Sequence, residues 1–261
     1  MKIHEFYRDT ANVHLNASIM ALVPPIIIVM GNLSFLQSKQ IMILTLPFFI
    51  YSIISYQFYL FRKRQSISIG RHMPAAESYY QSLFDSRHLL VVFMNTLSSK
   101  VYLYFPTGHL AGEIRKCREE GVSPLRKPTI YTLYSRDNQA IAFYKMIGKK
   151  STRIEVYNQN NEYLGCFEKE KCALLKSKKS LLSETGEFIG VVEGSSYFMD
   201  EQVLNKFSQQ EGSLRRGWMP VEWRDLFPEP NTPVLSFAEN LNNKDKLLRM
   251  SFLINEYFSE R

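Results

Sequence analysis

The stretch YSRDNQAIAF (residues 134–143) recurs in altered form as YNQNNEYLGC (157–166), LSETGEFIGV (182–191) and, more faintly, YFPTGHLAGE (104–113). Each copy opens with a large apolar residue and passes through three or four mostly polar residues. Asn or Gly then occupies the fifth position, and an apolar pair followed by a small residue completes the unit. The fifth residues are Asn138, Asn161, Gly186 and Gly108.

This pattern has a physical reading. Asn and Gly tolerate the left-handed backbone conformation that a hairpin turn requires. A small residue four places later allows the returning strand to bend or to approach another backbone closely. Repeated units of this kind predict successive hairpins of a meander, in a sheet that curls or closes. The alternative is a set of functional loops, but four gap-free copies favour a scaffold.

The flanking segments extend the β-rich region. Residues 89–93 and 101–105 and the segment TPVLSF (232–237) are rich in β-branched and aromatic residues, as strands are. Residues 200–230 contain both tryptophans and several prolines, and we expect them to be irregular. The chain ends in KDKLLRMSFLINEYFSER (244–261), which predicts a helix over 244–259 that is apolar around most of its circumference. Such a helix needs burial on most sides, which a barrel threaded by it would supply.

These motifs resemble the tubby-like superfamily, which includes the tubby C-terminal domains, the LURP-one-related proteins and the phospholipid scramblases. The resemblance covers residues 89–261 and rests on the four units, the strand at 232–237 and the terminal helix. It implies a closed, twelve-stranded antiparallel barrel around a central helix. The Pro-rich and Cys-rich N-terminal region of scramblases is absent, and no phosphoinositide-binding pair can be matched residue by residue.

The first sixty residues have a different composition. Residues 10–38 contain no Asp, Glu, Lys or Arg, and after Lys39 the next charge is Arg62. About twenty apolar residues suffice to cross a bilayer as a helix, so we predict two transmembrane helices at 17–36 and 41–61. Pro24 and Pro25 predict a kink in the first. A cleaved signal peptide and a re-entrant or interfacial hairpin are the alternatives.

The basic residues near the ends of the spans predict the orientation. Lys2 and Arg8 precede the first span, a basic cluster follows the second, and Lys39 alone lies between them. By the positive-inside rule, both termini should be cytoplasmic, in a two-span protein of the cell membrane. The predicted division is therefore a cytoplasmic flank (1–16), the hairpin (17–61), a basic juxtamembrane linker (62–88) and the barrel domain (89–261).

The sequence shows no catalytic signature. The five histidines lack metal-ligand spacing, and neither a nucleophile motif nor a phosphate-binding glycine loop is present. We therefore predict no enzyme activity, no metal and no cofactor. The 32 basic and 25 acidic residues give a net charge of +7 without a dense basic stripe on the barrel domain, which argues against nucleic-acid binding.

Basic side chains remain as candidate lipid-binding or anion-binding groups. We predict such a role for residues beside the second span and in a loop of the barrel: Arg62, Lys63, Arg64, Arg71, Lys149 and Lys150. Solvation in loops is expected for the remaining basic residues of this region: Arg153, Lys176, Lys178 and Lys179. The leading hypothesis is a non-enzymatic, membrane-anchored tubby-like protein that binds a lipid headgroup such as an anionic phospholipid, a small ligand or a protein partner. Scramblase-like lipid translocation, or an enzyme whose site forms only in three dimensions, is the alternative.

Overall fold

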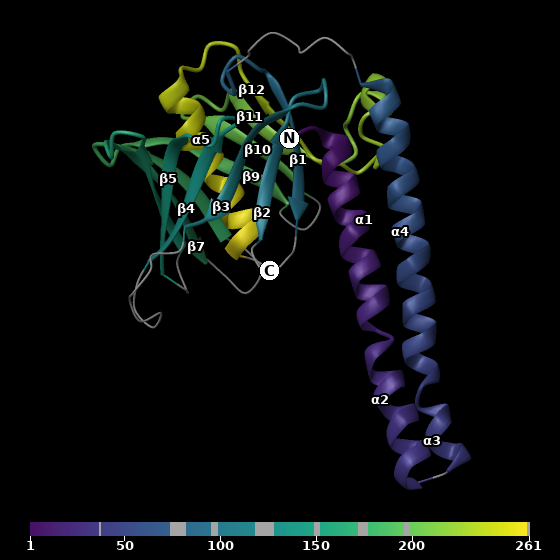
Figure 1. The fold of residues 1–261 in the computed structure, drawn as a ribbon. Helices are drawn as coiled ribbons and strands as arrows, with labels where there is room; N and C mark the ends of the chain where they lie inside the picture. The colour runs from purple at the N-terminus through teal and green to yellow at the C-terminus, as the bar shows by residue number, and fades with distance from the viewer. Residues whose placement is uncertain are drawn as a thin grey trace. The chain divides into compact units, whose positions relative to one another are not determined.

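A computed structural model describes residues 1–36, 38–73, 82–94, 99–117, 128–148, 152–171, 177–195 and 199–259 (Figure 1). The chain divides into two compact units, Met1–Met73 and Pro74–Arg261. We call them the helical unit and the barrel unit.

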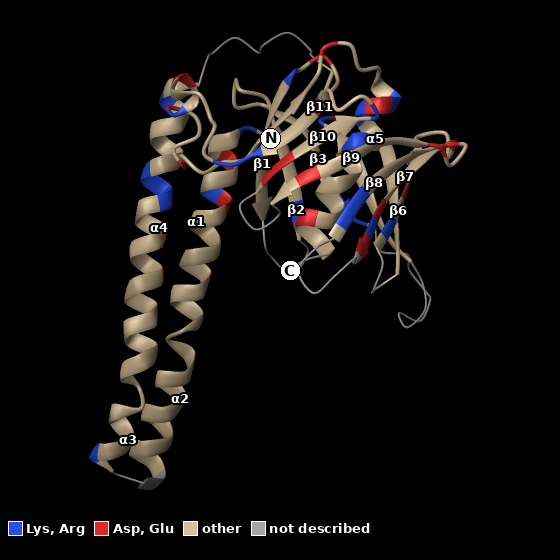
Figure 2. Cartoon of the chain, turned by 180° about the vertical axis from the view of Figure 1, so that it is seen from behind, with Lys and Arg blue, Asp and Glu red and all other residues tan. Residues whose placement is uncertain are grey.

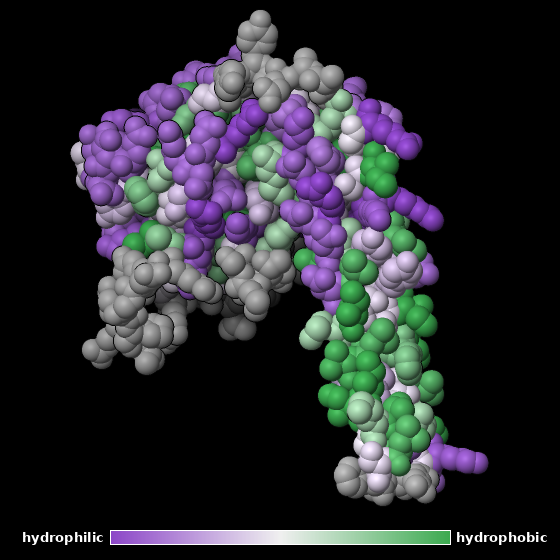
Figure 3. Space-filling view, in the orientation of Figure 1, coloured by the Kyte–Doolittle hydropathy of each residue, from purple (hydrophilic) through white to green (hydrophobic). Residues whose placement is uncertain are grey.

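The helical unit is a long antiparallel hairpin (Figure 1). Its two arms, Ile3–Ser34 and Lys39–His72, are each long and apolar enough to cross a membrane. Most apolar side chains along the arms point outward and are exposed, as the green surface in Figure 3 shows. Lys and Arg gather toward the ends of the arms, and the shafts between them carry no charged residue (Figure 2).

The arms are interrupted at prolines. Helix α1 (Ile3–Met20) ends before α2 (Val23–Gly31), whose first turn contains Pro24 and Pro25, as the predicted kink requires. A π-helical turn (Asn32–Leu36) follows. The second arm comprises α3 (Lys39–Ile43) and α4 (Leu46–His72), and the break between them differs from the uninterrupted span that the sequence predicted. Helix α4 also continues to His72, so the first part of the predicted linker (62–88) is helical.

Small polar side chains join the two arms. The Ser18 hydroxyl donates to the Ser52 carbonyl at 2.9 Å, and the Ser52 hydroxyl donates to the Ser18 carbonyl at 3.0 Å. Ser66 donates to the His4 carbonyl at 2.7 Å. Small residues let two helix backbones approach closely, which favours association where water is absent. These three serine hydroxyls therefore face inward, between the arms.

The barrel unit is a closed antiparallel barrel of twelve strands in meander order. Pairing of the first strand with the last, with His88 opposite Ser236, closes it. The strands are β1 (His88–Met94), β2 (Lys100–Tyr104), β3 (Leu110–Lys116), β4 (Thr129–Ser135), β5 (Ala140–Ile147), β6 (Thr152–Asn158), β7 (Tyr163–Lys171), β8 (Ser177–Ser183), β9 (Phe188–Ser195), β10 (Asp200–Asn205), β11 (Gln210–Arg215) and β12 (Val234–Phe237).

The four repeat units form the hairpin turns β2–β3, β4–β5, β6–β7 and β8–β9, as predicted. Their fifth residues all have a positive φ, for example 60° at Asn138 and 83° at Gly186. Each turn is followed by a register shift, the mark of a β-bulge. A fifth unit (204–213) forms the β10–β11 turn, with Ser208 at φ 60°. This unit departs from the sequence pattern of the other four because serine replaces Asn or Gly at its fifth position. The expectation that residues 200–230 are irregular is therefore wrong for β10 and β11.

Glycine at the ninth position is required sterically in three of the units, at Gly112, Gly165 and Gly190. A Cβ atom on Gly190 would lie 2.4 Å from the Leu204 carbonyl oxygen of the neighbouring strand. On Gly165 it would lie 2.3 Å from the Leu182 carbonyl oxygen. Both contacts are far below van der Waals distance and involve backbone. The close approach predicted from the sequence is therefore confirmed.

The predicted C-terminal helix fills the barrel (Figure 1). It comprises α5 (Asn243–Ile254) and a π-helical turn, η3 (Asn255–Ser259), and all residues from Lys246 to Ile254 are buried. The Asn242 side chain caps the helix by accepting from the Asp245 amide at 2.8 Å. From the wall, the buried Tyr144 hydroxyl donates to the Leu247 carbonyl at 3.2 Å. The core of the unit is thus the interface between the strands and their own helix.

Two substitutions in one hairpin should separate backbone conformation from steric space. Gly190→Ala should destabilise the full chain by about 3 kcal/mol or more, because its methyl group overlaps the Leu204 carbonyl. Gly186→Asn is the matched control, since nothing lies within 4 Å of its Cβ position and Asn occupies the same site in two sister units. It should change stability by less than about 0.5 kcal/mol in denaturant unfolding. Equal losses in the two variants would contradict the steric explanation.

Candidate functional site

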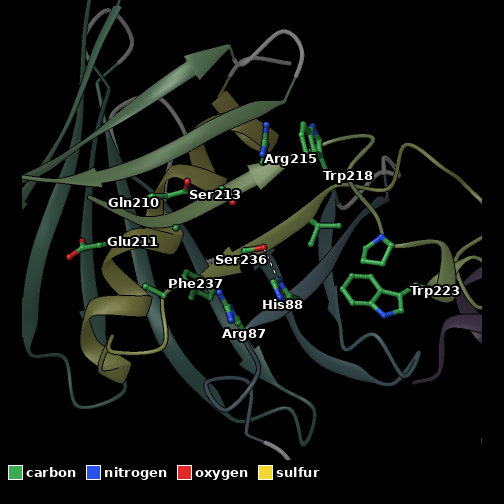
Figure 4. A pocket seen from close by; sticks show the side chains of 14 residues that line it. Arg87, His88, Gln210, Glu211, Ser213, Arg215, Trp218, Trp223, Ser236 and Phe237 are labelled. Atoms are coloured by element: carbon green, nitrogen blue, oxygen red, sulfur yellow. Dashed lines mark hydrogen bonds between the residues drawn. The ribbon is translucent and has the colours of Figure 1, made fainter. Parts of the chain in front are cut away.

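A groove of about 530 Å³ lies on the outer face of the barrel wall (Figure 4). Its floor comes from β11, β12 and the start of β1, and residues 218–223 line one side. The register of these strands creates the floor. Leu214 and Leu235 point into the core, so their neighbours alternate to the outside. Ser213, Ser236 and His88 are directly opposite one another and form a polar row across three strands.

His88 is the titratable group at the centre of this row. Its Nδ1 atom and the Ser236 hydroxyl share a hydrogen bond of 2.9 Å. The Trp223 ring lies beside the imidazole, with 6.0 Å between ring centroids. Burial, and secondarily the positive charge of Arg87, lowers the pKa of His88. The neutral imidazole is therefore favoured. Because Nδ1 is engaged by Ser236, the ring can offer one further nitrogen to a ligand, as a donor or an acceptor according to the tautomer.

Two arginines mark the ends of the groove. The guanidinium of Arg215 lies 3.7 Å from the centroid of the Trp218 ring, and its Nε donates to Asp200 at 2.9 Å. Stacking and the ion pair together fix the plane of this guanidinium. At the other end, the guanidinium of Arg87 donates to the Glu239 carboxylate at 2.8 Å, and both side chains of this ion pair are largely exposed.

Residues 218–223, which line one side of the groove, belong to a segment with buried apolar side chains of its own. Phe227 is fully buried, and its ring lies 6.3 Å from that of Tyr104 on β2. Leu90 and Met219 are buried as well. The segment between β11 and β12 is therefore packed against the barrel wall. It includes the short helix η2 (Val221–Trp223), which carries one tryptophan of the groove.

The electrostatics of the groove favour an acceptor-rich ligand. Its one carboxylate, Glu211, is bound by Arg249 of the central helix, whose Nε donates at 2.8 Å, and also accepts from Asn205. Among the remaining polar groups of the lining, the arginine and indole groups only donate, whereas the glutamine, serine and histidine groups can both donate and accept.

The basic residues predicted as binding groups are not in this groove. Arg62, Lys63, Arg64 and Arg71 all lie on α4 in the helical unit. Lys63 donates to the Tyr59 hydroxyl at 2.9 Å, and the Arg62 guanidinium lies over the Tyr7 ring. Lys149 and Lys150 lie outside the described residues, as does Lys176. In the part of the chain that the structure describes, no cluster suited to a metal ion occurs.

The expected loop position of three further basic residues is wrong. Arg153 lies in β6, and Lys178 and Lys179 lie in β8. Because side chains alternate along a strand, Lys178 is exposed while Lys179 points into the barrel. Its ammonium group forms ion pairs there with Glu201 of β10 and Glu256 of η3.

This buried cluster ties the end of the central helix to the wall. Lys179 lies 3.0 Å from Glu256, and the Asn255 amide donates to the same carboxylate at 2.8 Å. Burial alone would lower the pKa of Lys179, but the charges of Glu201 and Glu256 outweigh it, and the pKa is raised. Lys179 is therefore charged at neutral pH. No sequence signal distinguishes it from Lys178.

No protein-family model and no curated protein matches the chain. A solved X-ray structure of a protein from Arabidopsis thaliana is similar, with 12% sequence identity and a TM-score of 0.42. The match covers 67% of this chain and 91% of that one. The barrel is therefore established by the strand topology of the chain itself.

Removal of the buried lysine should be costly, whereas removal of its neighbour should not. Lys179→Met leaves two carboxylates without their ammonium partner, and a broken buried ion pair costs about 3–5 kcal/mol. Lys178→Met, on the same strand with its side chain exposed, should change stability by less than about 0.5 kcal/mol. Denaturant unfolding of the two variants measures the difference. If both substitutions lowered the free energy of unfolding by a similar, small amount, Lys179 would not form the buried ion pairs with Glu201 and Glu256.

Proposed function

We propose that this chain is a non-enzymatic, tubby-like binding protein, anchored in the cell membrane with both termini in the cytoplasm. The anchor is the helical unit, whose two arms are long and apolar enough to span a bilayer. Arg62, Lys63, Arg64 and Arg71 would lie at the cytoplasmic headgroups, where each contributes about 1 kcal/mol of attraction to an anionic leaflet. Twelve strands around a central helix support the tubby-like assignment.

The outer groove carries the binding proposal. The barrel interior is filled by α5, so a ligand or partner must be recognised on the outside of the wall. The groove combines aromatic side chains with several polar groups, the usual composition of a binding site, and its volume falls in the usual range of ligand sites.

Binding is favoured over catalysis by the surroundings of Ser236. A serine nucleophile needs a base oriented by a third group and a pair of free amides for the oxyanion. His88 contacts Ser236, and in the described part of the chain its other neighbours are Arg87 and Trp223, with no carboxylate placed to orient the imidazole. Ser236 also lies within β12, where ladder pairing engages the backbone. The hydrogen bond therefore serves to organise a binding surface.

The scramblase-like alternative requires a hydrophilic path through the bilayer. In the described part of the hairpin, Ser18 and Ser52 bond to each other between the arms, and the outward side chains of the shafts are mostly apolar. This arrangement favours an anchor over a lipid pathway.

Protease protection tests the anchor. Protease added to right-side-out cells should leave the barrel unit intact until the membrane is permeabilised, and carbonate washing should leave the protein in the membrane fraction. Both results follow from two spans with cytoplasmic termini. Digestion of the barrel unit in intact cells would show that it lies outside the cell. Release of the protein by carbonate would show that the helical unit is not inserted in the membrane.

Photocrosslinking tests the groove. Benzoylphenylalanine in place of the exposed Gln210, which lines the groove, should capture a bound molecule in cells. The same probe in place of Lys178, exposed on β8, is the control and should capture none. Absence of any adduct at Gln210, or identical adducts at both positions, would contradict a binding role for the groove.

A further inference from the structure

The groove has a floor of mostly small residues and an open rim. The floor includes Ser213, Gly212 and Ser236. Its rim carries groups that are themselves open to solvent: Trp218 is 62% exposed, and the Arg87 side chain is 61% exposed. Exposed Trp and Arg side chains are the residue types enriched at protein interfaces.

The two arginines are separated along the groove. In Figure 4, Arg215 lies at one end and Arg87 at the other, with Ser236 between them. On β12, Val234 pairs with Arg215, and the Phe237 amide donates to the Arg87 carbonyl. Val234 and Phe237 are three residues apart, which corresponds to about 10 Å along a strand. In an extended peptide of polyproline II conformation, which has three residues per turn, acidic residues three positions apart lie on one face at about 9 Å.

The lining includes two guanidinium groups and two indoles, which are hydrogen-bond donors only. Gln210, Trp218 and Trp223 make no side-chain hydrogen bond within the described residues, and both indoles are donors only. The Nε of Arg215 is engaged by Asp200, whereas its two terminal nitrogens make no hydrogen bond to described residues. A guanidinium fixed in this way can bind a carboxylate through its fork. The Arg87–Glu239 pair is exposed, so exchanging Glu239 for another carboxylate costs little.

The floor cannot accept a peptide by strand addition. Strands β11, β12 and β1 each have two neighbours in the closed barrel, so their backbone groups are paired. Recognition must therefore come from side chains. These side chains match the carbonyl oxygens of an extended backbone and the carboxylates that it carries.

We infer that the groove docks an extended, acidic segment of a partner protein, with one carboxylate on Arg215 and a second on Arg87. The apolar parts of the segment lie against Trp218, Pro220 and Trp223. This inference rests on the proposed binding role of the groove and names the partner chemistry.

The two tryptophans make the test selective. They are the only tryptophans in the chain, and both line the groove, so tryptophan fluorescence of the full-length protein in detergent reports this site. The probe is acetyl-AEAPEA-amide, whose two glutamates are three positions apart and whose proline favours extended backbone. The matched control is acetyl-AKAPKA-amide. The acidic peptide should change the fluorescence saturably and the basic peptide should not.

Variants assign the effect to the arginines. Arg215→Gln should weaken binding of the acidic peptide about tenfold, and Arg87→Gln, which is more exposed, about threefold. Arg153→Gln removes an ion-paired arginine from β6, outside the groove, and should leave binding unchanged. Thermal unfolding confirms that each variant is folded. Equal binding of both peptides, or unchanged binding by Arg215→Gln, would overturn the inference.

An experiment with lipid vesicles distinguishes failure of the peptide inference from failure of the proposed binding role. Phosphatidylserine vesicles should not change the tryptophan signal. If they do so saturably while the acidic peptide has no effect up to about 1 mM, the groove binds lipid, and the peptide inference fails although the binding role stands. If neither probe binds and Gln210 gives no photoadduct, both proposals fail.

Discussion

Closure of the barrel is the constraint on which the rest of this unit depends. Pairing of β1 with β12 leaves no free edge, so every strand is fixed on two sides. A wall of twelve strands encloses more space than its own side chains fill. The C-terminal helix fills that space, and its residues from Lys246 to Ile254 are buried. Because the interior is occupied, the proposed recognition of another molecule would take place on the outer surface of the wall.

Charged residues in the core specify how the helix is seated. Arg249 binds Glu211 of β11, and one end of the helix beyond it is held by Lys179, Glu201 and Glu256. Buried ion pairs add little net stability, but any other register of the helix would leave these charges unpaired. The first pair also reaches the groove, since β11 carries Glu211 toward the helix and Ser213 and Arg215 on the groove side. Helix packing and groove geometry are thus coupled through one strand.

The helical unit follows a different physical rule. Its arms expose apolar side chains and place serine hydroxyls against each other, the reverse of a water-soluble hairpin. The proposed membrane environment would account for both features, because backbone and hydroxyl groups in hydrocarbon must be satisfied internally. Such an anchor would hold the barrel unit at a surface, which raises the local concentration of any partner that shares the membrane.

Local sequence determined the apolar arms, the hairpin turns and the threading helix, because each depends on neighbouring residues. Asn138 and Gly186 indicate a left-handed backbone conformation by their residue type. The apolar residues around most of the helix at 244–259 indicate that the helix is buried. The fifth turn could not be predicted from the sequence because serine, here Ser208, is an unusual residue for a left-handed position. The groove and the buried cluster were decided only by the tertiary structure. Lys178 and Lys179 are indistinguishable in sequence, and Arg87, Arg215 and Ser236 meet only when β1, β11 and β12 pair, because strand register converts positions far apart in the chain into one surface.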